Sequence, residues 1–175
     1  MRGIRLKKII NKGELRRKVK ELGKRISTDF ANKNPILVGI LKGSFVLLAD
    51  LIREIHIPHE VDFISVASYK EKTEGSGVVE MIKDLSTNIE GRNVIIVEDI
   101  VDTGLTLDYI RKNLLIRNPR SLSILALLDK RKRRRVKVPI KYVGFTIPGD
   151  FVVGYGLDYN QQFRNLSFVA KIKGV

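Results

Sequence analysis

Residues 94–106, V-I-I-V-E-D-I-V-D-T-G-L-T, join an apolar run to a turn rich in acids. The first four residues are β-branched, which favours a buried strand. Glu98 and Asp99 follow directly, and a third acid, Asp102, opens the sequence Asp-Thr-Gly-Leu-Thr. The stretch therefore predicts a strand at residues 94–97 that ends in carboxylates and continues into a turn before the next helix.

The turn at residues 102–106 has the composition of a phosphate-binding loop. Gly104 lets successive backbone N–H groups converge, the following helix adds the positive end of its dipole, and threonine hydroxyls can donate as well. A simple helix N-cap at Asp102 would use the same residues, so the turn alone leaves both interpretations open. Glu98 and Asp99 would repel a phosphate that touched them, but they suit a vicinal diol or a divalent cation. Together the two features indicate a clamp for a ribose 5-phosphate.

Two common nucleotide-binding motifs are absent from the sequence. It contains no G-x-x-x-x-G-K-[ST] of a P-loop and no G-x-G-x-x-G after the first expected strand. Gly154-Tyr155-Gly156 comes too late in the chain and lacks the third glycine. Neither motif therefore accounts for the acidic strand end.

Composition and charge restrict the class of protein. The 175 residues are 43% hydrophobic and 30% charged, which predicts one soluble globular domain. The net charge of +14 calls for an anionic partner, whether nucleic acid, a membrane surface or a phosphorylated substrate. The lack of cysteine excludes disulfides and thiolate metal sites and predicts a cytoplasmic location. No apolar run reaches the roughly 18 to 20 residues that span a bilayer, and no secretory signal is expected.

Hydrophobic periodicity predicts alternating strands and helices along the chain. Helices are expected at residues 13–31, 45–55 and 107–116. Strands are expected at residues 36–41, 61–69, 78–85, 94–97, 122–128, 142–147, 151–153 and 166–172. This order predicts an α/β fold with a mostly parallel twisted sheet flanked by helices. Ligands bind at the carboxyl ends of such strands, where Lys42-Gly43-Ser44 and residues 98–106 would face one crevice.

Residues 98–106 resemble the signature of the phosphoribosyltransferases, which bind phosphoribosyl pyrophosphate (PRPP). The Glu-Asp pair is similar to the hypoxanthine-guanine branch, since other branches usually begin with two aspartates. Further stretches match this branch in order: L-K-G-S at 41–44, S-Y at 68–69 with K-E-K-T-E-G-S-G after it, L-D-K-R at 128–131, F-V-V-G-Y-G-L-D-Y at 151–159 and F-R-N-L at 163–166. The resemblance implies a type I phosphoribosyltransferase fold in one domain, residues 1–175, with a mobile lid around 68–80 and a purine-binding hood around 145–175.

The resemblance assigns the acidic strand end and the turn to the ribose phosphate. Glu98 and Asp99 would hold the ribose hydroxyls and a Mg²⁺ ion. Asp102 would be the general base that accepts the N7 proton of the purine. The site for PRPP and its 5'-phosphate as a whole comprises Glu98, Asp99, Asp102, Thr103, Gly104, Leu105 and Thr106.

The same resemblance assigns the other stretches to the pyrophosphate and the base. Lys42, Gly43 and Arg164 would bind pyrophosphate, with a candidate cis peptide at Lys42–Gly43. Lys130 would donate to O6 of the purine, which favours a 6-oxo over a 6-amino ring because an ammonium group has donors only. The remaining assignments are Phe151 for stacking on the ring, the Val152 carbonyl for the purine edge, Asp158 for a second Mg²⁺, and Ser68 and Tyr69 for the lid.

The expected function is purine salvage by transfer of the 5-phosphoribosyl group from PRPP to hypoxanthine, guanine or both, with Mg²⁺ as cofactor. The alternative is an RNA-binding regulator on the same fold, which the net charge and the basic run at residues 131–135 favour. Glu98 and Lys130 match the 6-oxopurine pattern, so nucleic acid is not the expected partner. No membrane partner is expected, and the resemblance implies a homodimer or homotetramer.

Overall fold

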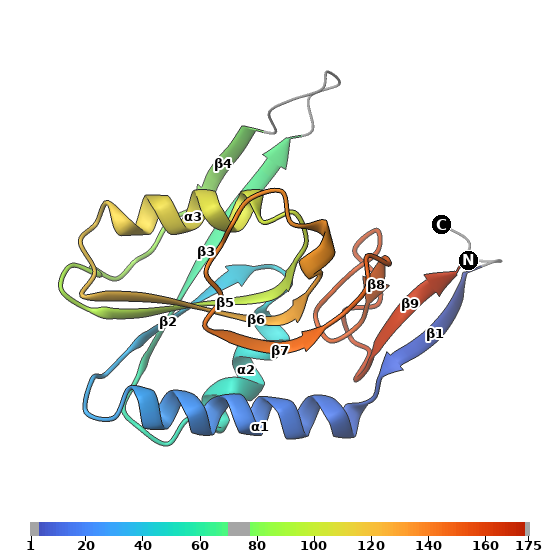
Figure 1. The fold of residues 1–175 in the computed structure, drawn as a ribbon, viewed down its shortest axis with the longest axis horizontal. Helices are drawn as coiled ribbons and strands as arrows, with labels where there is room; N and C mark the ends of the chain where they lie inside the picture. Colours follow the sequence, from blue (N-terminus) through green and yellow to red (C-terminus); the bar gives the residue numbers. More distant parts are fainter. Residues whose placement is uncertain (1–3, 70–77, 174–175) are drawn as a thin grey trace.

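The computed structural model describes residues 4–69 and 78–173. Within them, six strands form the main sheet in the order β4-β3-β2-β5-β6-β7 (Figure 1). All neighbours are parallel except β3 and β4, which pair as an antiparallel hairpin. The mostly parallel sheet is therefore confirmed. The strands are β2 (Ile36–Leu41), β3 (Glu60–Tyr69), β4 (Val78–Lys83), β5 (Asn93–Val101), β6 (Ser121–Asp129) and β7 (Tyr142–Thr146).

Helices cover both faces of the main sheet. Figure 1 shows α1 (Lys12–Asp29) and α2 (Phe45–Arg53) on one face and α3 (Leu105–Leu115) on the other. Ile95 and Val97 of β5 pack into the core under α1 and α2, whereas Val94 and Ile96 pack into the core under α3. Side chains alternate along a strand, and this strand is buried on both faces. This is why its sequence is continuously apolar. No helix in the described part of the chain has the length and apolar character that crossing a bilayer requires.

The central strand continues through the acids, where the sequence analysis expected it to end at residue 97. Glu98 lies opposite Ala126 of β6, and Val101 lies opposite Asp129. The prediction failed because β6 is long enough to pair with the whole of β5, and such pairing overrides the low strand propensity of acids. Gly104, with φ of 86°, then makes the turn that starts α3 at Leu105, two residues earlier than expected.

A second, smaller sheet stands beside the carboxyl edge of the main one. Its order is β1 (Arg5–Ile10), β9 (Val169–Lys173) and β8 (Val152–Val153), with antiparallel pairing throughout. The sequence analysis did not predict β1. Five of its six residues are exposed, so no alternating apolar pattern marks it, and it exists by backbone pairing with β9. We call β1, β8 and β9 the small sheet.

Gly23 allows α1 to lie directly against the end of α2. A Cβ atom at this position would be 2.6 Å from the carbonyl oxygen of Glu54, the residue that caps α2. The N-terminus of α1 is fixed by a capping box in which the Asn11 side chain accepts from the Glu14 N–H and the Glu14 side chain accepts from the Asn11 N–H. The packing of α1 against α2 also helps to hold residues 42–44, because α2 begins directly after them.

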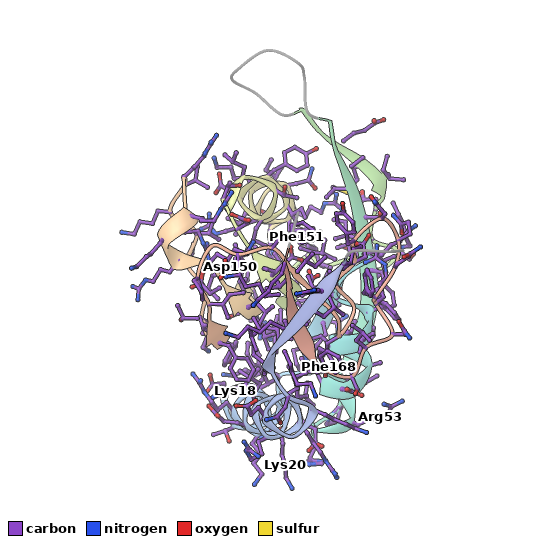
Figure 2. All side chains as sticks on the ribbon, turned by 90° about the vertical axis from the view of Figure 1, so that its right-hand side faces the viewer. Lys18, Lys20, Arg53, Asp150, Phe151 and Phe168 are labelled. Atoms are coloured by element: carbon purple, nitrogen blue, oxygen red, sulfur yellow. The ribbon has the colours of Figure 1, made fainter. Side chains whose placement is uncertain are left out.

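We expect Gly23→Ala to destabilise the protein by about 1 to 3 kcal/mol, since the clash with Glu54 outweighs a gain of about 1 kcal/mol in helix propensity. The measurement is the free energy of unfolding in urea. Lys20→Ala is the control, because Lys20 is an exposed residue of the same helix (Figure 2). A Gly23→Ala variant more stable than the parent would contradict the packing argument.

Candidate active site

The carboxyl ends of β2, β5 and β6 meet the small sheet at one cavity of about 500 Å³. The cavity brings together most of the residues expected to bind pyrophosphate and base, although they come from distant parts of the chain. Those that line it are Lys42, Gly43, Asp99, Asp102, Lys130, Phe151, Val152, Asp158 and Arg164. Leu157 and Gln161, which sequence analysis did not assign, line it as well.

A second cavity of about 160 Å³ lies at the start of α3. It is lined by Glu98, Asp102, Thr103, Gly104 and Thr106, which are residues expected around the 5'-phosphate. Asp102 borders both cavities, so it separates the two compartments. Leu105 is half-exposed at the first position of α3.

Among the described residues, neither acid at the end of β5 forms a salt bridge, although the charge of Arg164 acts on Asp99. Asp99 is only 8% exposed and lies against Gly43, where a Cβ atom would overlap its carboxylate. Burial raises the pKa of Asp99 to about 6, although backbone hydrogen bonds and the charge of Arg164 lower it. Burial and then the charge of Asp99 raise the pKa of Glu98 well above its usual value. In the described structure, Oε2 of Glu98 is buried and accepts no hydrogen bond.

These carboxylates fit a Mg²⁺ ion. The unpartnered Oε2 of Glu98 and the carboxylate of the next residue, Asp99, are hard oxygen ligands, and Mg²⁺ commonly uses one or two protein carboxylates together with substrate oxygens. Among residues 4–69 and 78–173, no three acids or histidines stand close enough to hold a metal by themselves. Asp158 is engaged elsewhere, since it accepts from Arg164 at 2.7 Å and from the Gln161 N–H at 2.9 Å.

Asp102 is held by two cations. Lys130 Nζ donates to its Oδ2 at 2.9 Å, and Arg133 Nε donates to its Oδ1 at 2.7 Å. Burial raises the pKa of Asp102, but hydrogen bonds and charge from Lys130, and then from Arg133, outweigh burial and keep the pKa below its usual value. Asp102 is therefore an ionised acceptor at neutral pH. Lys130 is 6% exposed and is an interior donor next to it.

The sequence did not predict the contact of Arg133 with Asp102, because the basic run at residues 131–135 favours RNA binding. Arg133 ends the short helix η1 (Arg131–Arg133), and Arg134 pairs with the buried Asp129 at 2.7 Å. Two cations of the run thus pair with acids of the protein. Asp129, two residues before the run in the sequence, was the available signal for an internal ion pair.

The base-side residues come from the small sheet and its loop. Phe151 is half-exposed and meets Tyr159 edge to face, with ring centroids 5.7 Å apart. Figure 2 shows Phe151 and Phe168 toward opposite ends of the small sheet. Because Phe151 is half-exposed and lines the cavity, its ring is available to stack on a planar ligand.

The loop expected to bind pyrophosphate contains a cis peptide, between Leu41 and Lys42. The resemblance had pointed to the next bond, Lys42–Gly43, which is not cis. Ser68 and Tyr69 end β3 and pair with Val79 and Val78 of β4. Of the lid expected around 68–80, residues 70–77 lie outside the described part of the structure.

Comparisons with known proteins agree with this geometry. The family described as "Phosphoribosyl transferase domain" matches residues 7–160. The chain is 46% identical over 169 residues to a hypoxanthine-guanine phosphoribosyltransferase of Dictyostelium discoideum, covering 94% of each chain. It is 44% identical over 166 residues to the hypoxanthine phosphoribosyltransferase of Escherichia coli strain K12, covering 94% of this chain and 93% of that one.

Solved structures show the same likeness. A crystal structure of a hypoxanthine-guanine phosphoribosyltransferase from Bacillus anthracis superimposes with a TM-score of 0.92 at 45% identity, covering 97% of this chain and 100% of the other. The resemblance inferred from residues 98–106 and the type I fold that it implied are therefore confirmed. The chain belongs to the phosphoribosyl transferase domain family.

Proposed function

We propose that this protein is a purine-salvage enzyme that transfers the 5-phosphoribosyl group from PRPP to a 6-oxopurine, hypoxanthine or guanine, and releases pyrophosphate. The observation that carries the proposal is the pair of Asp102 and buried Lys130 in one cavity with the acidic end of β5 and the loop at residues 42–44. The transfer needs a proton acceptor, a donor for a ring oxygen, a site for pyrophosphate and carboxylates for the ribose and Mg²⁺.

The two cavities that Asp102 borders bind different parts of the substrates: the smaller one takes the 5'-phosphate, and the larger one takes the pyrophosphate and the base. The turn at residues 103–106 and the N-terminus of α3 offer backbone N–H groups and hydroxyls to the 5'-phosphate. Glu98 and Asp99 accept from the ribose hydroxyls and hold Mg²⁺, and Asp158 is the third carboxylate proposed to bind metal. When bound, Mg²⁺ would supply positive charge near the leaving pyrophosphate.

Lys42, Gly43 and Arg164 bind the pyrophosphate on the other side of the ribose. Arg164 now forms a salt bridge with Asp158. To bind pyrophosphate it must exchange this salt bridge for one with the substrate, which carries more negative charge. The net charge of +14 attracts the strongly anionic PRPP to the protein.

The base binds between Phe151 and the acidic turn. Lys130 donates to O6, the Val152 carbonyl accepts from the purine edge, and Asp102 accepts the N7 proton while N9 attacks C1' of the ribose and the bond to pyrophosphate breaks. Asp102 is suited to this because it is ionised and rigidly held. Closure of Ser68, Tyr69 and the segment after them over the site would exclude water from the cationic sugar.

The proposal also covers the cellular location of the enzyme and its oligomeric state. The absence of cysteine from the 175 residues fits a reducing compartment, and we place the enzyme in the cytoplasm. We propose a homodimer or homotetramer. The RNA-binding alternative gains no support from the basic run, since Arg133 and Arg134 are occupied by Asp102 and Asp129.

A spectrophotometric assay with PRPP, Mg²⁺ and one base at a time tests the function. We expect turnover of hypoxanthine, guanine or both, and none of adenine, because Lys130 offers no acceptor to a 6-amino group. Xanthine is the third 6-oxopurine to be tried. Lack of turnover with all three 6-oxopurines would contradict the proposed activity.

Asp102→Asn should lower kcat for hypoxanthine by about 10² to 10⁴, the usual contribution of general base catalysis. The amide keeps an oxygen that accepts from Lys130 but cannot take the N7 proton. Binding of PRPP, measured by calorimetry, should change by less than about threefold, since Asp102 is proposed to act in the chemical step. Equal losses in turnover and in PRPP binding would argue against a role as base.

Lys130→Gln should raise the KM for hypoxanthine by about 10- to 100-fold, since a charged hydrogen bond to O6 is lost. Arg133→Gln is the matched control: it removes the other cation on Asp102, but Arg133 does not line the cavity and its side chain is 54% exposed. Steady-state kinetics with varied base distinguish the two variants. Similar rises in KM would mean that charge on Asp102, and not donation to O6, governs base binding.

A further inference from the structure

Two buried tyrosines donate hydrogen bonds to aspartates on helices. The Tyr155 hydroxyl donates to Asp50 Oδ2 of α2 at 2.8 Å, and the Tyr142 hydroxyl donates to Asp29 Oδ2 of α1 at 2.6 Å. Tyr155 is 6% exposed and Tyr142 is fully buried. Burial, and then the hydrogen bond to Asp50, raises the pKa of Tyr155 far above its usual value, so its hydroxyl remains a donor. The two bonds are chemically alike, but only the first joins elements of the candidate site.

The turn around Tyr155 presses on the pyrophosphate loop. Gly154, Tyr155 and Gly156 have φ values of 97°, 53° and 100°, so the chain bends sharply there. A Cβ atom at Gly156 would overlap the carbonyl oxygen of Gly43. The Gly156 carbonyl also accepts from Arg164 Nη1 at 2.7 Å. This one turn therefore touches the loop and the arginine that are proposed to bind pyrophosphate.

The loop at residues 42–44 is clamped from several sides. Gly43 lies between the carboxylate of Asp99 and the backbone of Gly156. At its far end Ser44 is buried, and its hydroxyl donates to the Ile40 carbonyl at 2.7 Å. Helix α2 starts immediately afterwards at Phe45 and carries Asp50. The hydrogen bond from Tyr155 to Asp50 therefore fixes the helix that carries the loop to the turn against which the loop packs.

We propose that Tyr155 is a positioning residue for the pyrophosphate site: through Asp50, its hydroxyl sets the spacing between the loop at residues 42–44 and the turn at residues 154–156. This inference rests on the proposed function, since it takes pyrophosphate as the ligand of the loop. Tyr155 does not line the active-site cavity. Loss of its hydroxyl therefore weakens binding of pyrophosphate-bearing ligands and leaves binding of the base unchanged.

The first test compares Tyr155→Phe with Tyr142→Phe, which removes the matched hydrogen bond between β7 and α1. Both variants should lose similar thermal stability. Only Tyr155→Phe should raise the KM for PRPP, and for pyrophosphate in the reverse reaction, by about 5- to 20-fold, as expected for one lost hydrogen bond and a small displacement of the loop. The KM for hypoxanthine should stay within about twofold of the parent value in both variants.

Variants of Asp50 test the route through α2. Asp50→Asn keeps an oxygen that accepts from Tyr155 and should retain the parent KM for PRPP. It also loses the pairing of Asp50 with Arg53, but this exposed pair contributes little. Asp50→Leu removes the acceptor and should behave like Tyr155→Phe. The double variant of Tyr155→Phe and Asp50→Leu should be no worse than either single one, because both break the same bond.

Equal effects of the two tyrosine variants on PRPP would overturn the inference, as would a rise in the KM for hypoxanthine alone. Turnover by the parent protein is measured first. If the parent has no turnover, the proposed function fails, and calorimetric titration with inorganic pyrophosphate and Mg²⁺ then decides the role of Tyr155. Unchanged pyrophosphate affinity in Tyr155→Phe would contradict that role.

Discussion

Glu98 and Asp99 are consecutive acids near the carboxyl end of β5, where the Asp99 side chain and the Oε2 atom of Glu98 are buried. Burial disfavours the charged form of a carboxyl group and raises the pKa of both groups, and the charge of Asp99 raises the pKa of Glu98 further. The surrounding fold tolerates this arrangement because β5 is fixed on both faces by apolar cores and on both edges by β2 and β6. The rest of the site is arranged around this unfavourable pair.

Each further part of the site contacts the pair or its neighbours. Gly43 lies against Asp99, so the pyrophosphate loop has room for no larger side chain there. Arg164 lowers the pKa of Asp99 through its charge and holds the turn at Gly156. Asp102, three residues after Asp99, forms salt bridges with Lys130 and Arg133. Asp102 forms salt bridges within the protein, whereas Glu98 and Asp99 form none among the described residues. This difference fits the proposed roles, in which Glu98 and Asp99 bind a metal ion and the ribose and Asp102 accepts a proton.

Local patterns made much of this arrangement predictable. The apolar run of β5, the acids after it and the glycine turn before α3 are adjacent in the sequence, so the strand, the turn and the crevice beside them could be inferred from residues 94–106. The strand β1 could not, because its residues are mostly exposed and follow no period. The contacts of Arg133 with Asp102 and of Tyr155 with Asp50 join residues 31 and 105 positions apart, and no local pattern encodes such pairs.

The most direct test of this account is the thermal stability of Glu98→Gln and of the parent at pH 5 and pH 8, with and without Mg²⁺ and PRPP. Folding raises the pKa of Asp99 from 3.8 to about 6. A carboxyl group with a raised pKa stabilises the fold at low pH, and this contribution is lost as the pH rises through the pKa of the folded state. Glu98→Gln removes one charge of the pair, so without ligand it should unfold at a higher temperature than the parent at pH 8, with a smaller difference at pH 5. The variant should also lose most of the stabilisation by Mg²⁺ and PRPP. A variant that is less stable than the parent at pH 8 and is still stabilised fully by the ligands would contradict the account.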